Sequence, residues 1–417
     1  MIDVLISGGG IAGPVLAWWL RRYGFRPTIV ERAPAPRHGG YKVDIRGAAL
    51  QVIDRMGLRE HIRCHDTDMR LTRFVDADGG QLATMDARVF GGREGDDAEI
   101  MRGDLVRILT EATVDGVEYI FGDSIAALAP HGSGVGVTFE RSSPRTFDLV
   151  IGADGLHSTV RRLAFGPEAS PLRSLGHHIA IFPVPGHFGL DRTELMHVTP
   201  GRTVGVYRTA GAPDARAMFL FRSPAGEHSD RDVTAQKALL TEAFAGQGWQ
   251  VPRLLEAMRD AADFYLDSFS QARLPRWSTG RVTLVGDAAY GPSPASGQGS
   301  SLGIVGAYVL ATALAEAGGD PEVGFADYER RMRPFAETNQ ALADRNIKGM
   351  VLGSAAQIRF QMLMLRLMPH LPGRESMIRR VTEPIRRAAN GITLPEPAPL
   401  LALHGAADVV GQDADRP

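Results

Sequence analysis

The feature that most constrains this chain is a glycine-rich turn between an apolar strand and an apolar helix at its N-terminus. Val4 to Ser7 is a short apolar run without helical period, and the turn Gly8-Gly9-Gly10-Ile11-Ala12-Gly13 leads into an apolar segment that continues to Leu20. Thr28 to Glu31 has the pattern of the next strand. This order predicts a βαβ unit that opens a parallel sheet, so we expect an α/β fold.

Gly8, Gly10 and Gly13 have the spacing of a dinucleotide-binding turn. In such a turn the first glycine permits the tight reversal, the second lets the backbone approach a pyrophosphate, and the third lets helix and strand pack closely. Glu31 ends the next strand 18 residues after Gly13. A carboxylate there can accept both ribose hydroxyls but would repel a 2′-phosphate. The motif predicts bound FAD or NAD rather than NADP, with a glycine turn used only for packing as the alternative.

Two further motifs place an acid after a strand and a glycine. They are Gly152-Ala153-Asp154-Gly155 and Gly286-Asp287-Ala288-Ala289. Each would bring a carboxylate to the carboxyl edge of a sheet, where open α/β folds bind ligands. Each acid could instead cap its own turn. Together with the first turn they form three sites on one sheet edge, and FAD is the simplest ligand long enough to touch all three.

Length and pattern predict several domains in the 417 residues. Short strand-like pieces near 71–99 and alternating segments between about 176 and 223 predict a second sheet that walls a pocket. A helix-rich segment with a Met- and Leu-dense patch at Gln361–Met368 follows, and such patches are usually core. We expect a Rossmann-like FAD-binding domain at 1–70, 100–175 and 272–325, an inserted mixed β-sheet substrate domain at 71–99 and 176–271, a C-terminal helical region at 326–390 and a flexible tail at 391–417.

Charge and cysteine content limit the kinds of partner that we expect and the cellular compartment in which the protein works. The chain has 46 basic and 48 acidic residues, so its net charge of -2 offers no overall field for nucleic acid or an anionic membrane, although local patches remain possible. Cys64 is the only cysteine, which excludes an intramolecular disulfide and a Cys-based metal cage. No uninterrupted apolar run reaches the roughly 18–20 residues of a membrane-spanning helix. We expect a soluble, cytoplasmic protein without a metal.

The three motifs, in this order and spacing, resemble those of the class A single-component flavin monooxygenases. This family includes para-hydroxybenzoate hydroxylase, aromatic polyketide hydroxylases and tetracycline-inactivating monooxygenases. The resemblance covers the chain to about residue 390. It implies non-covalent FAD, NADPH or NADH as a transient reductant, and hydroxylation of an aromatic or polyketide-like small molecule by O2 through a flavin C4a-hydroperoxide.

The resemblance also assigns cofactor residues. It implies that the glycine turn holds the FAD pyrophosphate, that Glu31 and Arg32 meet the adenosine end, and that Arg102 reaches the ribityl and phosphate region. A solvated arginine at a helix start is the alternative for Arg102. The remaining implied cofactor residues are Asp154, Asp287, Pro294, Gly297 and Gly299. Asp287 would bond the ribityl chain, whereas Asp154 would organise a turn more than touch the ligand.

The sequence departs from the family pattern at three positions near the flavin. Tyr290 stands where most members have His, Ser301 where they have Asn, and Gly306 where an Asp is usual. These positions shape the turn and the layer behind the cofactor, so we expect flavin binding to be intact. No second glycine fingerprint forms a separate NADPH domain, and the motifs of a flavin halogenase are missing.

Substrate residues are much less evident. Arg202 resembles by position an arginine on the substrate sheet of tetracycline-degrading relatives, and Arg46 could face the same cavity. A surface or sheet-edge position is the alternative for both. Of the neighbours His177 and His178 at most one can face a pocket, because adjacent strand residues point to opposite faces.

The sequence therefore predicts an FAD-dependent monooxygenase that uses NAD(P)H and O2. A flavin oxidase or dehydrogenase of the same fold is one alternative. A flavin-containing protein that sequesters a planar antibiotic without turnover is another. The substrate and the oligomeric state stay open.

Overall fold

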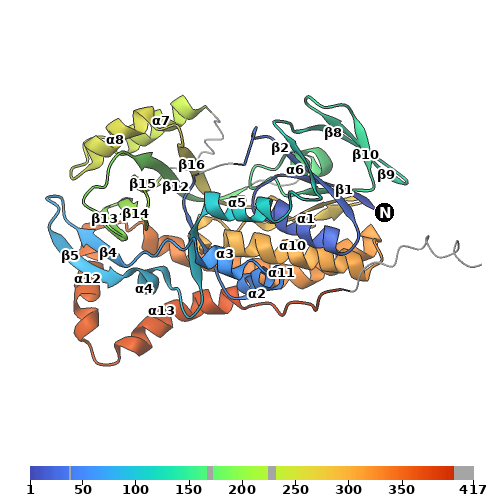
Figure 1. The fold of residues 1–417 in the computed structure, drawn as a ribbon. Helices are drawn as coiled ribbons and strands as arrows, with labels where there is room; N and C mark the ends of the chain where they lie inside the picture. The colour runs from blue at the N-terminus through green and yellow to red at the C-terminus, as the bar shows by residue number, and fades with distance from the viewer. Residues whose placement is uncertain (37–38, 167–171, 224–231, 399–417) are drawn as a thin grey trace, which may run out of the picture.

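The computed structural model describes residues 1–36, 39–166, 172–223 and 232–398 (Figure 1). Its first layer is a six-stranded sheet in the order β17-β18-β11-β1-β2-β7. The strands are β1 (Asp3–Ser7), β2 (Arg26–Glu31), β7 (Glu118–Phe121), β11 (Leu149–Gly152), β17 (Ser278–Thr279) and β18 (Val282–Leu284). The central strands are parallel, with Val4 opposite Leu149 and Pro27. The predicted βαβ start is confirmed, with helix α1 (Ala12–Arg22) between β1 and β2.

Two long helices form the centre of this part. Helix α10 (Gly299–Glu316) packs on α1, where Ala12 lies against Gly303, and α11 (Pro321–Met350) packs on α10. α10 is apolar on all sides and almost wholly buried, as expected of a core helix. By length and composition it could also cross a membrane, at a mean hydropathy of 1.3, but 83% of it is buried inside the protein.

The second sheet has seven strands in the order β16-β12-β15-β14-β13-β4-β5. They are β4 (Leu71–Val75), β5 (Gln81–Asp86), β12 (Arg173–Val184), β13 (Thr193–Thr199), β14 (Arg202–Arg208), β15 (Ala215–Arg222) and β16 (Tyr265–Gln271). All neighbours are antiparallel except β4 and β13. β4 and β5 come from the early segment of short strands, so two distant parts of the chain build this sheet.

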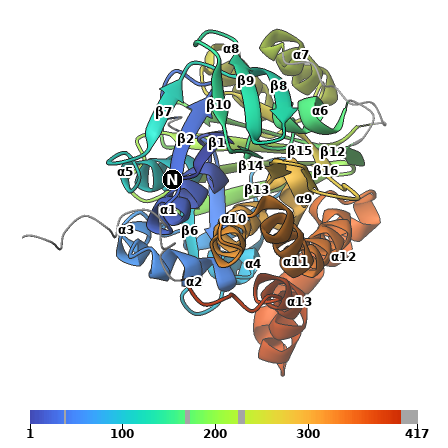
Figure 2. The ribbon, with the colours of Figure 1, turned by 90° about the vertical axis from the view of Figure 1, so that its right-hand side faces the viewer.

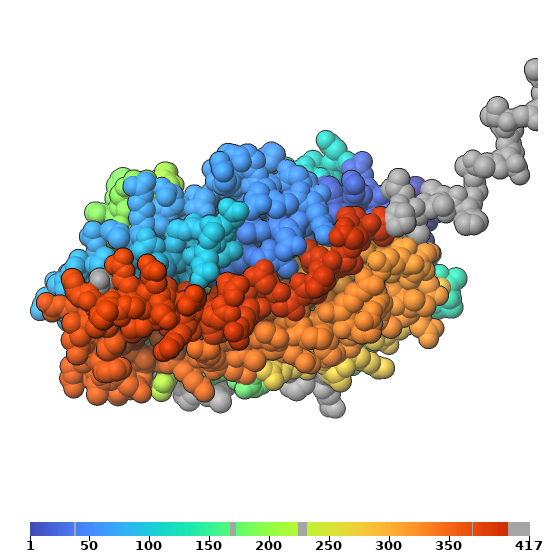
Figure 3. Space-filling view, turned by 90° about the horizontal axis from the view of Figure 1, so that it is seen from below, coloured from blue at the N-terminus to red at the C-terminus, as the bar shows by residue number. Residues whose placement is uncertain are grey.

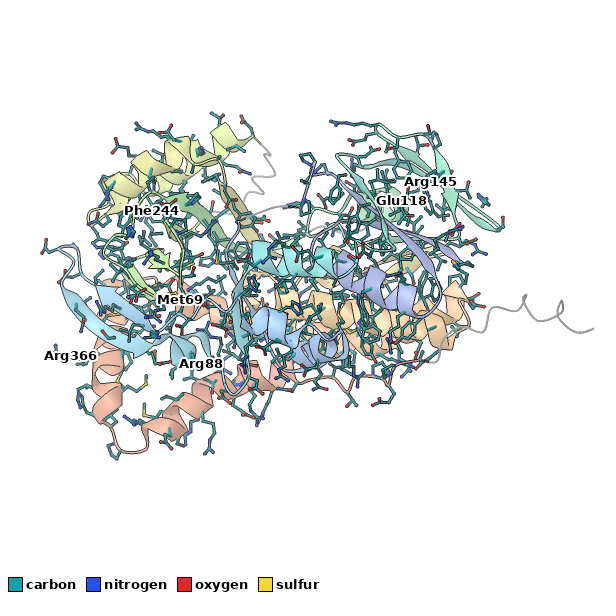
Figure 4. The ribbon with its side chains drawn as sticks, viewed as in Figure 1. Met69, Arg88, Glu118, Arg145, Phe244 and Arg366 are labelled. Carbon is teal, nitrogen blue, oxygen red and sulfur yellow. The ribbon has the colours of Figure 1, made fainter. Side chains whose placement is uncertain are left out.

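The outer face of the second sheet is covered by α7 (Val233–Ala243) and α8 (Val251–Asp260), two helices that the sequence analysis did not predict (Figure 1). Phe219 and Phe221 of β15 point to this side and meet Phe244, which follows α7 (Figure 4). The inner face turns toward α10, α11 and the first sheet. Every other residue of each strand therefore faces the interior of the molecule.

Smaller elements complete the fold. They are the sheet of β8 (Ile125–His131), β9 (Gly134–Phe139) and β10 (Arg145–Phe147), the pair of β3 (Lys42–Ile45) and β6 (Ala98–Met101), the helices α2 (Ala48–Arg55), α3 (Arg59–Arg63), α4 (Ala87–Gly91), α5 (Arg102–Glu111), α6 (Thr159–Phe165), α9 (Asp287–Tyr290), α12 (Ala355–Leu367) and α13 (Arg374–Ala389), and the 3-10 turns η1 (Pro294–Ser296) and η2 (Met368–His370).

A cluster of buried charges joins the β3–β6 pair to the second sheet. Lys42 lies 3.3 Å from Glu194 of β13 and 4.0 Å from Glu99 of β6, with its ammonium group 4.4 Å from the centre of the Tyr207 ring. The other charged members are Asp44, Arg46 and Arg93. Burial alone would lower the pKa of Lys42, but Glu194 and Glu99 outweigh burial and raise it. The cluster thus holds three cations against three carboxylates.

The C-terminal segment differs in part from the predicted flexible tail. Residues 391–398 run along the surface beside α2 and α10 (Figures 2 and 3). The backbone carbonyl of Pro395 accepts from Tyr308 Oη at 2.6 Å and from Arg55 Nη1 at 2.6 Å, and Leu394 is buried. These contacts fix the segment. The rest of the predicted tail, from residue 399, lies outside the described residues.

Candidate functional site

In the glycine turn after β1, protein atoms leave no room for a side chain at Gly8 or Gly13, whereas the space beside Gly10 is open. A Cβ on Gly8 would lie 2.5 Å from the carbonyl oxygen of Ala153, and one on Gly13 would lie 2.0 Å from that of Gly8. At Gly10 the nearest atom would be Arg102 Nη2, at 3.7 Å. Helix α1 begins here without a side-chain cap or an acid in its first turn. Its free N–H groups and positive helix end therefore suit an anionic ligand above Gly10.

Glu31 stands beside this turn at the end of β2. Its Oε2 accepts from the N–H of Gly9 at 2.7 Å and its Oε1 from the N–H of Ala33 at 2.8 Å. These two bonds hold the carboxylate in place, and each oxygen keeps further lone pairs for a ribose hydroxyl. Arg32 next to it is exposed. The geometry is that expected of the adenosine end of a dinucleotide.

Arg102 and Asp287 come from distant parts of the chain and lie close enough for the charge of Arg102 to act on Asp287. Arg102 begins α5, and Asp287 begins α9 directly after β18. Asp287 lies deep in the molecule, so burial raises the pKa of its carboxyl while Arg102 lowers it. The Asp287 side chain is nevertheless exposed to solvent. A ligand can therefore reach this carboxylate from the solvent side.

The loop before α10 lies next to Asp287. Pro294 begins η1, Gly297 is exposed with a φ of +65°, and a Cβ on Gly299 would lie 3.8 Å from Asp287 Oδ1. Helix α10 starts at Gly299 without a side-chain cap or an acid in its first turn. The buried amide of Gln298 has no hydrogen-bond partner among the described residues. The free N–H groups at this uncapped helix start are what the polar edge of a bound flavin can satisfy.

A groove of about 410 Å³ opens beside the start of α5. It lies between Gly39 and Gly103 on one side and the end of β14 and start of β15 on the other. Tyr207 and Arg216 line it, and the buried hydroxyl of Tyr207 has no partner among the described residues. The groove therefore lies where the second sheet meets the start of α5.

Glu31 thus bonds the glycine turn, Gly10 lies next to Arg102, the charge of Arg102 acts on Asp287, and Asp287 lies next to Gly299. This series of residues suits an elongated dinucleotide such as FAD. The family model of the FAD binding domain matches residues 1–343. The chain belongs to this family.

Several relatives of this family member carry the name of a flavin- or FAD-dependent monooxygenase. It is 41% identical over 338 residues to a flavin-dependent monooxygenase from an unknown prokaryotic organism, covering 81% of this chain and 87% of the relative. It is 46% identical over 351 residues to "Uncharacterized protein Rv1260" of Mycobacterium tuberculosis (strain ATCC 25618 / H37Rv), covering 84% and 94%. The chain is an enzyme of the flavin-dependent monooxygenase class, as its sequence predicts.

Two solved structures share the whole architecture. The tetracycline destructase Tet(51) superposes with a TM-score of 0.84 at 34% identity, covering 95% of this chain and 99% of its own. The tetracycline destructase Tet(55) gives 0.82 at 37% identity, covering 94% and 98%. The predicted Rossmann-like domain with an inserted mixed sheet is confirmed.

Asp154 supports the FAD-binding domain from behind the glycine turn. Its carboxylate accepts from the N–H groups of Thr159 and Val160 at 2.8 and 3.1 Å and from the hydroxyl of Ser158. Burial raises its pKa despite these bonds. The acid caps α6, and the loop that carries it packs against Gly8. The structure therefore gives Asp154 a positioning role rather than a direct place in the cavity.

The two predicted substrate arginines lie elsewhere. Arg46 is buried in the charge cluster, where its guanidinium donates to Asp44 and to the carbonyls of Gly91 and Gly92 at 2.6 to 2.8 Å. Arg202 points to the outer face of the second sheet, where its Nε donates to the carbonyl of Ala243 after α7 at 2.5 Å. Both guanidinium groups are thus bound by protein. This geometry gives no support to a substrate contact for either residue.

Aromatic residues between the sheets are the part of the site that sequence reasoning missed. The rings of Tyr41 and Tyr265 lie 5.3 Å apart, and both side chains are half-buried. Burial raises the pKa of both hydroxyls, and the nearby charge of Arg102 opposes part of that rise. Of the two histidines, His177 turns its edge to Phe269 and His178 stacks on Phe221 at the outer side. The sequence around Tyr265 gives no sign of its role, because its partner Tyr41 is more than two hundred residues away.

The departures from the family pattern compensate one another. A Cβ on Gly306 would lie 1.8 Å from Tyr290 Oη, so the tyrosine hydroxyl occupies the space that a side chain at 306 would need. Tyr328 Oη donates to that hydroxyl at 3.1 Å. Ser301 Oγ lies 3.3 Å from the N–H of Arg46, from which it accepts. Tyr290 and Gly306 are therefore matched to each other, whereas Ser301 ties the start of α10 to the end of β3.

Asp287→Ala and Arg102→Ala are each expected to weaken FAD binding by about ten- to a hundredfold, because a charge-assisted hydrogen bond contributes about 1.5–3 kcal/mol. Titration of the apoprotein with FAD measures this. Arg107→Ala is the matched control, since Arg107 also lies on α5 but pairs with Glu111 at 3.2 Å, away from the groove. Unchanged affinity in both Asp287→Ala and Arg102→Ala would remove these residues from the cofactor site.

Proposed function

We propose that this family member catalyses the NAD(P)H- and O2-dependent hydroxylation of an aromatic or polyketide-like small molecule. The observation that carries the proposal is an apolar cluster that links the inner face of the second sheet to the flavin loop. Ile179, Ile181 and Leu220 of the sheet pack in it with Ala295 of η1. The half-buried side chains of Tyr41, Met218 and Tyr265 border this cluster. A planar apolar ligand would fit between them and the cofactor.

Bound FAD would accept a hydride from NAD(P)H and activate O2 for transfer of one oxygen atom to the substrate. The chain itself would position and shield the reactants. The N-terminus of α10 and the N–H groups around Gly297 and Gly299 would stabilise negative charge on the pyrimidine edge of the ring. The sheet would hold the acceptor carbon against the ring and exclude water. Such a reaction requires no acid–base pair from the protein.

The substrate class is supported by the two structural relatives. Tet(51) and Tet(55) are tetracycline destructases, which are named for a polycyclic planar substrate. The inner face of the second sheet offers mostly apolar and aromatic side chains, with Arg216 and Tyr207 along the groove. A fused-ring phenol combines the same two properties, a flat apolar body and a few polar groups at its edge.

The FAD-loaded enzyme is expected to oxidise NADPH slowly alone and severalfold faster when a tetracycline or an anthraquinone is added. The measurement is the loss of NADPH absorbance, followed by mass spectrometry of the product formed under 18O2. A gain of one labelled oxygen supports hydroxylation. Stoichiometric hydrogen peroxide with unmodified ligand would favour an oxidase. Tight ligand binding without NADPH consumption would favour a sequestering protein.

A further inference from the structure

Helix α12 is apolar on two opposite faces, of which the described chain covers one. Its inner face packs Met362, with Ile358 and Leu365, onto Phe74, Ala83 and Met196 of the second sheet. At 100° per residue the opposite face carries Phe360, Leu363 and Leu367. These three side chains, called here the outer stripe, are 67%, 52% and 41% exposed. A helix that is apolar on two faces is ordinarily buried on both.

Arginines flank the outer stripe without acidic partners. α12 contains Arg359 and Arg366, both exposed, and no acid. On α13 the exposed residues Arg374, Arg379 and Arg380 follow. None of these five arginines forms an ion pair within the part of the chain that the structure describes. The surface therefore combines exposed apolar area with unpaired positive charge, although the whole chain has a net charge of -2.

The position of α12 leaves the stripe accessible. α12 and α13 project at one end of the molecule beyond the second sheet, while the described chain ends at the opposite end (Figures 1 and 3). Arg366 points away from the body of the protein (Figure 4). Because the helix pair stands out from its surroundings, an extended flat surface could approach it without meeting the rest of the protein.

We propose that α12 lies on an anionic lipid membrane, with the outer stripe in the headgroup region and the flanking arginines on the lipid phosphates. Apolar side chains flanked by cations on one surface helix are what binds an amphipathic helix to such an interface. A second copy of the chain fits less well. A two-fold contact through the stripe would bring Arg359 and Arg366 of both copies together without acids to neutralise them.

Three apolar side chains and a few arginines give a peripheral and reversible attachment rather than an anchor. The overall composition predicts no membrane partner because it averages the charge over the whole chain. The two charge signs nearly cancel over the chain, whereas α12 has cations alone. Attachment through α12 would place the β4–β5 end of the second sheet close to lipid. Apolar polycyclic compounds accumulate in lipid.

The test is co-sedimentation of the full-length, FAD-loaded protein with vesicles of phosphatidylcholine, with and without phosphatidylglycerol. Binding is expected to the phosphatidylglycerol vesicles and to weaken as salt is added. Phe360→Glu/Leu363→Glu is expected to lower the partition coefficient by more than about tenfold, because two buried apolar groups become charged. Arg359→Gln and Arg366→Gln are each expected to lower it by about fivefold.

Val323→Glu and Arg63→Gln are the matched controls, since both residues are exposed on helices remote from α12, and both variants should bind as the parent does. Flavin content and melting temperature verify that each variant is folded. Equal binding of the Phe360→Glu/Leu363→Glu variant, or failure of the parent to bind phosphatidylglycerol vesicles, would overturn the proposal. So would a dimer in sedimentation velocity that this variant dissociates, because a second copy would then cover the stripe.

Discussion

Gly10→Val is expected to yield a folded protein that no longer retains FAD. In the absence of ligand the site has room for the side chain, since a Cβ at Gly10 would meet only Arg102 Nη2 at 3.7 Å. The valine methyl groups would instead fill the place of the pyrophosphate above the start of α1. Losing two charge-assisted hydrogen bonds there corresponds to a factor of about 10² to 10⁴ in affinity. Flavin absorbance after gel filtration and titration with added FAD measure the effect.

Two substitutions separate this effect from a general effect of valine on folding. Gly132→Val introduces the same side chain into a turn where a Cβ meets nothing within 4 Å, and it should retain FAD. Gly13→Ala should fail differently, by unfolding, because its Cβ would lie 2.0 Å from the backbone of Gly8. Normal flavin retention in Gly10→Val would place the nucleotide elsewhere in the molecule.

Gly306→Ala is expected to destabilise the protein, although replacing glycine by alanine inside a helix ordinarily stabilises it by about 1 kcal/mol. The new Cβ would lie 1.8 Å from Tyr290 Oη and 3.1 Å from Tyr290 Cζ. The ring is buried between Trp277 and Tyr328, so it has little space to move. Forcing an extra carbon into such packing costs about 1–3 kcal/mol. Denaturant unfolding of the FAD-loaded protein measures the difference.

Gly303→Ala in the same helix provides the control, because its Cβ would make an ordinary contact at 3.6 Å with Ala12. This variant should be as stable as the parent or more so. Tyr290→Phe/Gly306→Ala should be more stable than Gly306→Ala, since the atom in closest conflict is removed. An equal loss of stability with either residue at 290 would show that the two positions are independent.

The sequence predicted the elements whose signals are local. The first turn and the strands beside it follow from short apolar runs and from the spacing of Gly8, Gly10 and Gly13. Alternation also located the strands of the second sheet. The helices α7 and α8 were missed, because their apolar faces are defined by a sheet formed elsewhere in the chain.

The candidate site was predictable on the cofactor side and poorly so on the substrate side. Alternation shows that Arg202 shares a face of the sheet with Val204 and Val206, but it does not show which face meets the flavin. The structure places these residues on the outer face. Arg46 is held by partners that only the folded chain brings near. Lys42 and Glu194 are 152 residues apart, so no local pattern could pair them.

The charge cluster between the β3–β6 pair and the second sheet has an evolutionary consequence. Each ion there pairs with another member of the cluster, and a lone buried charge is strongly destabilising. A change of sign or loss of charge at one position is therefore tolerated only together with a change at a second. The inner face of the sheet can diversify one residue at a time to accept new ligands, whereas the joint that aligns the sheet with the flavin must change in pairs. A new ligand can thus be accommodated by a single substitution, whereas a new alignment of the sheet and the flavin needs at least two.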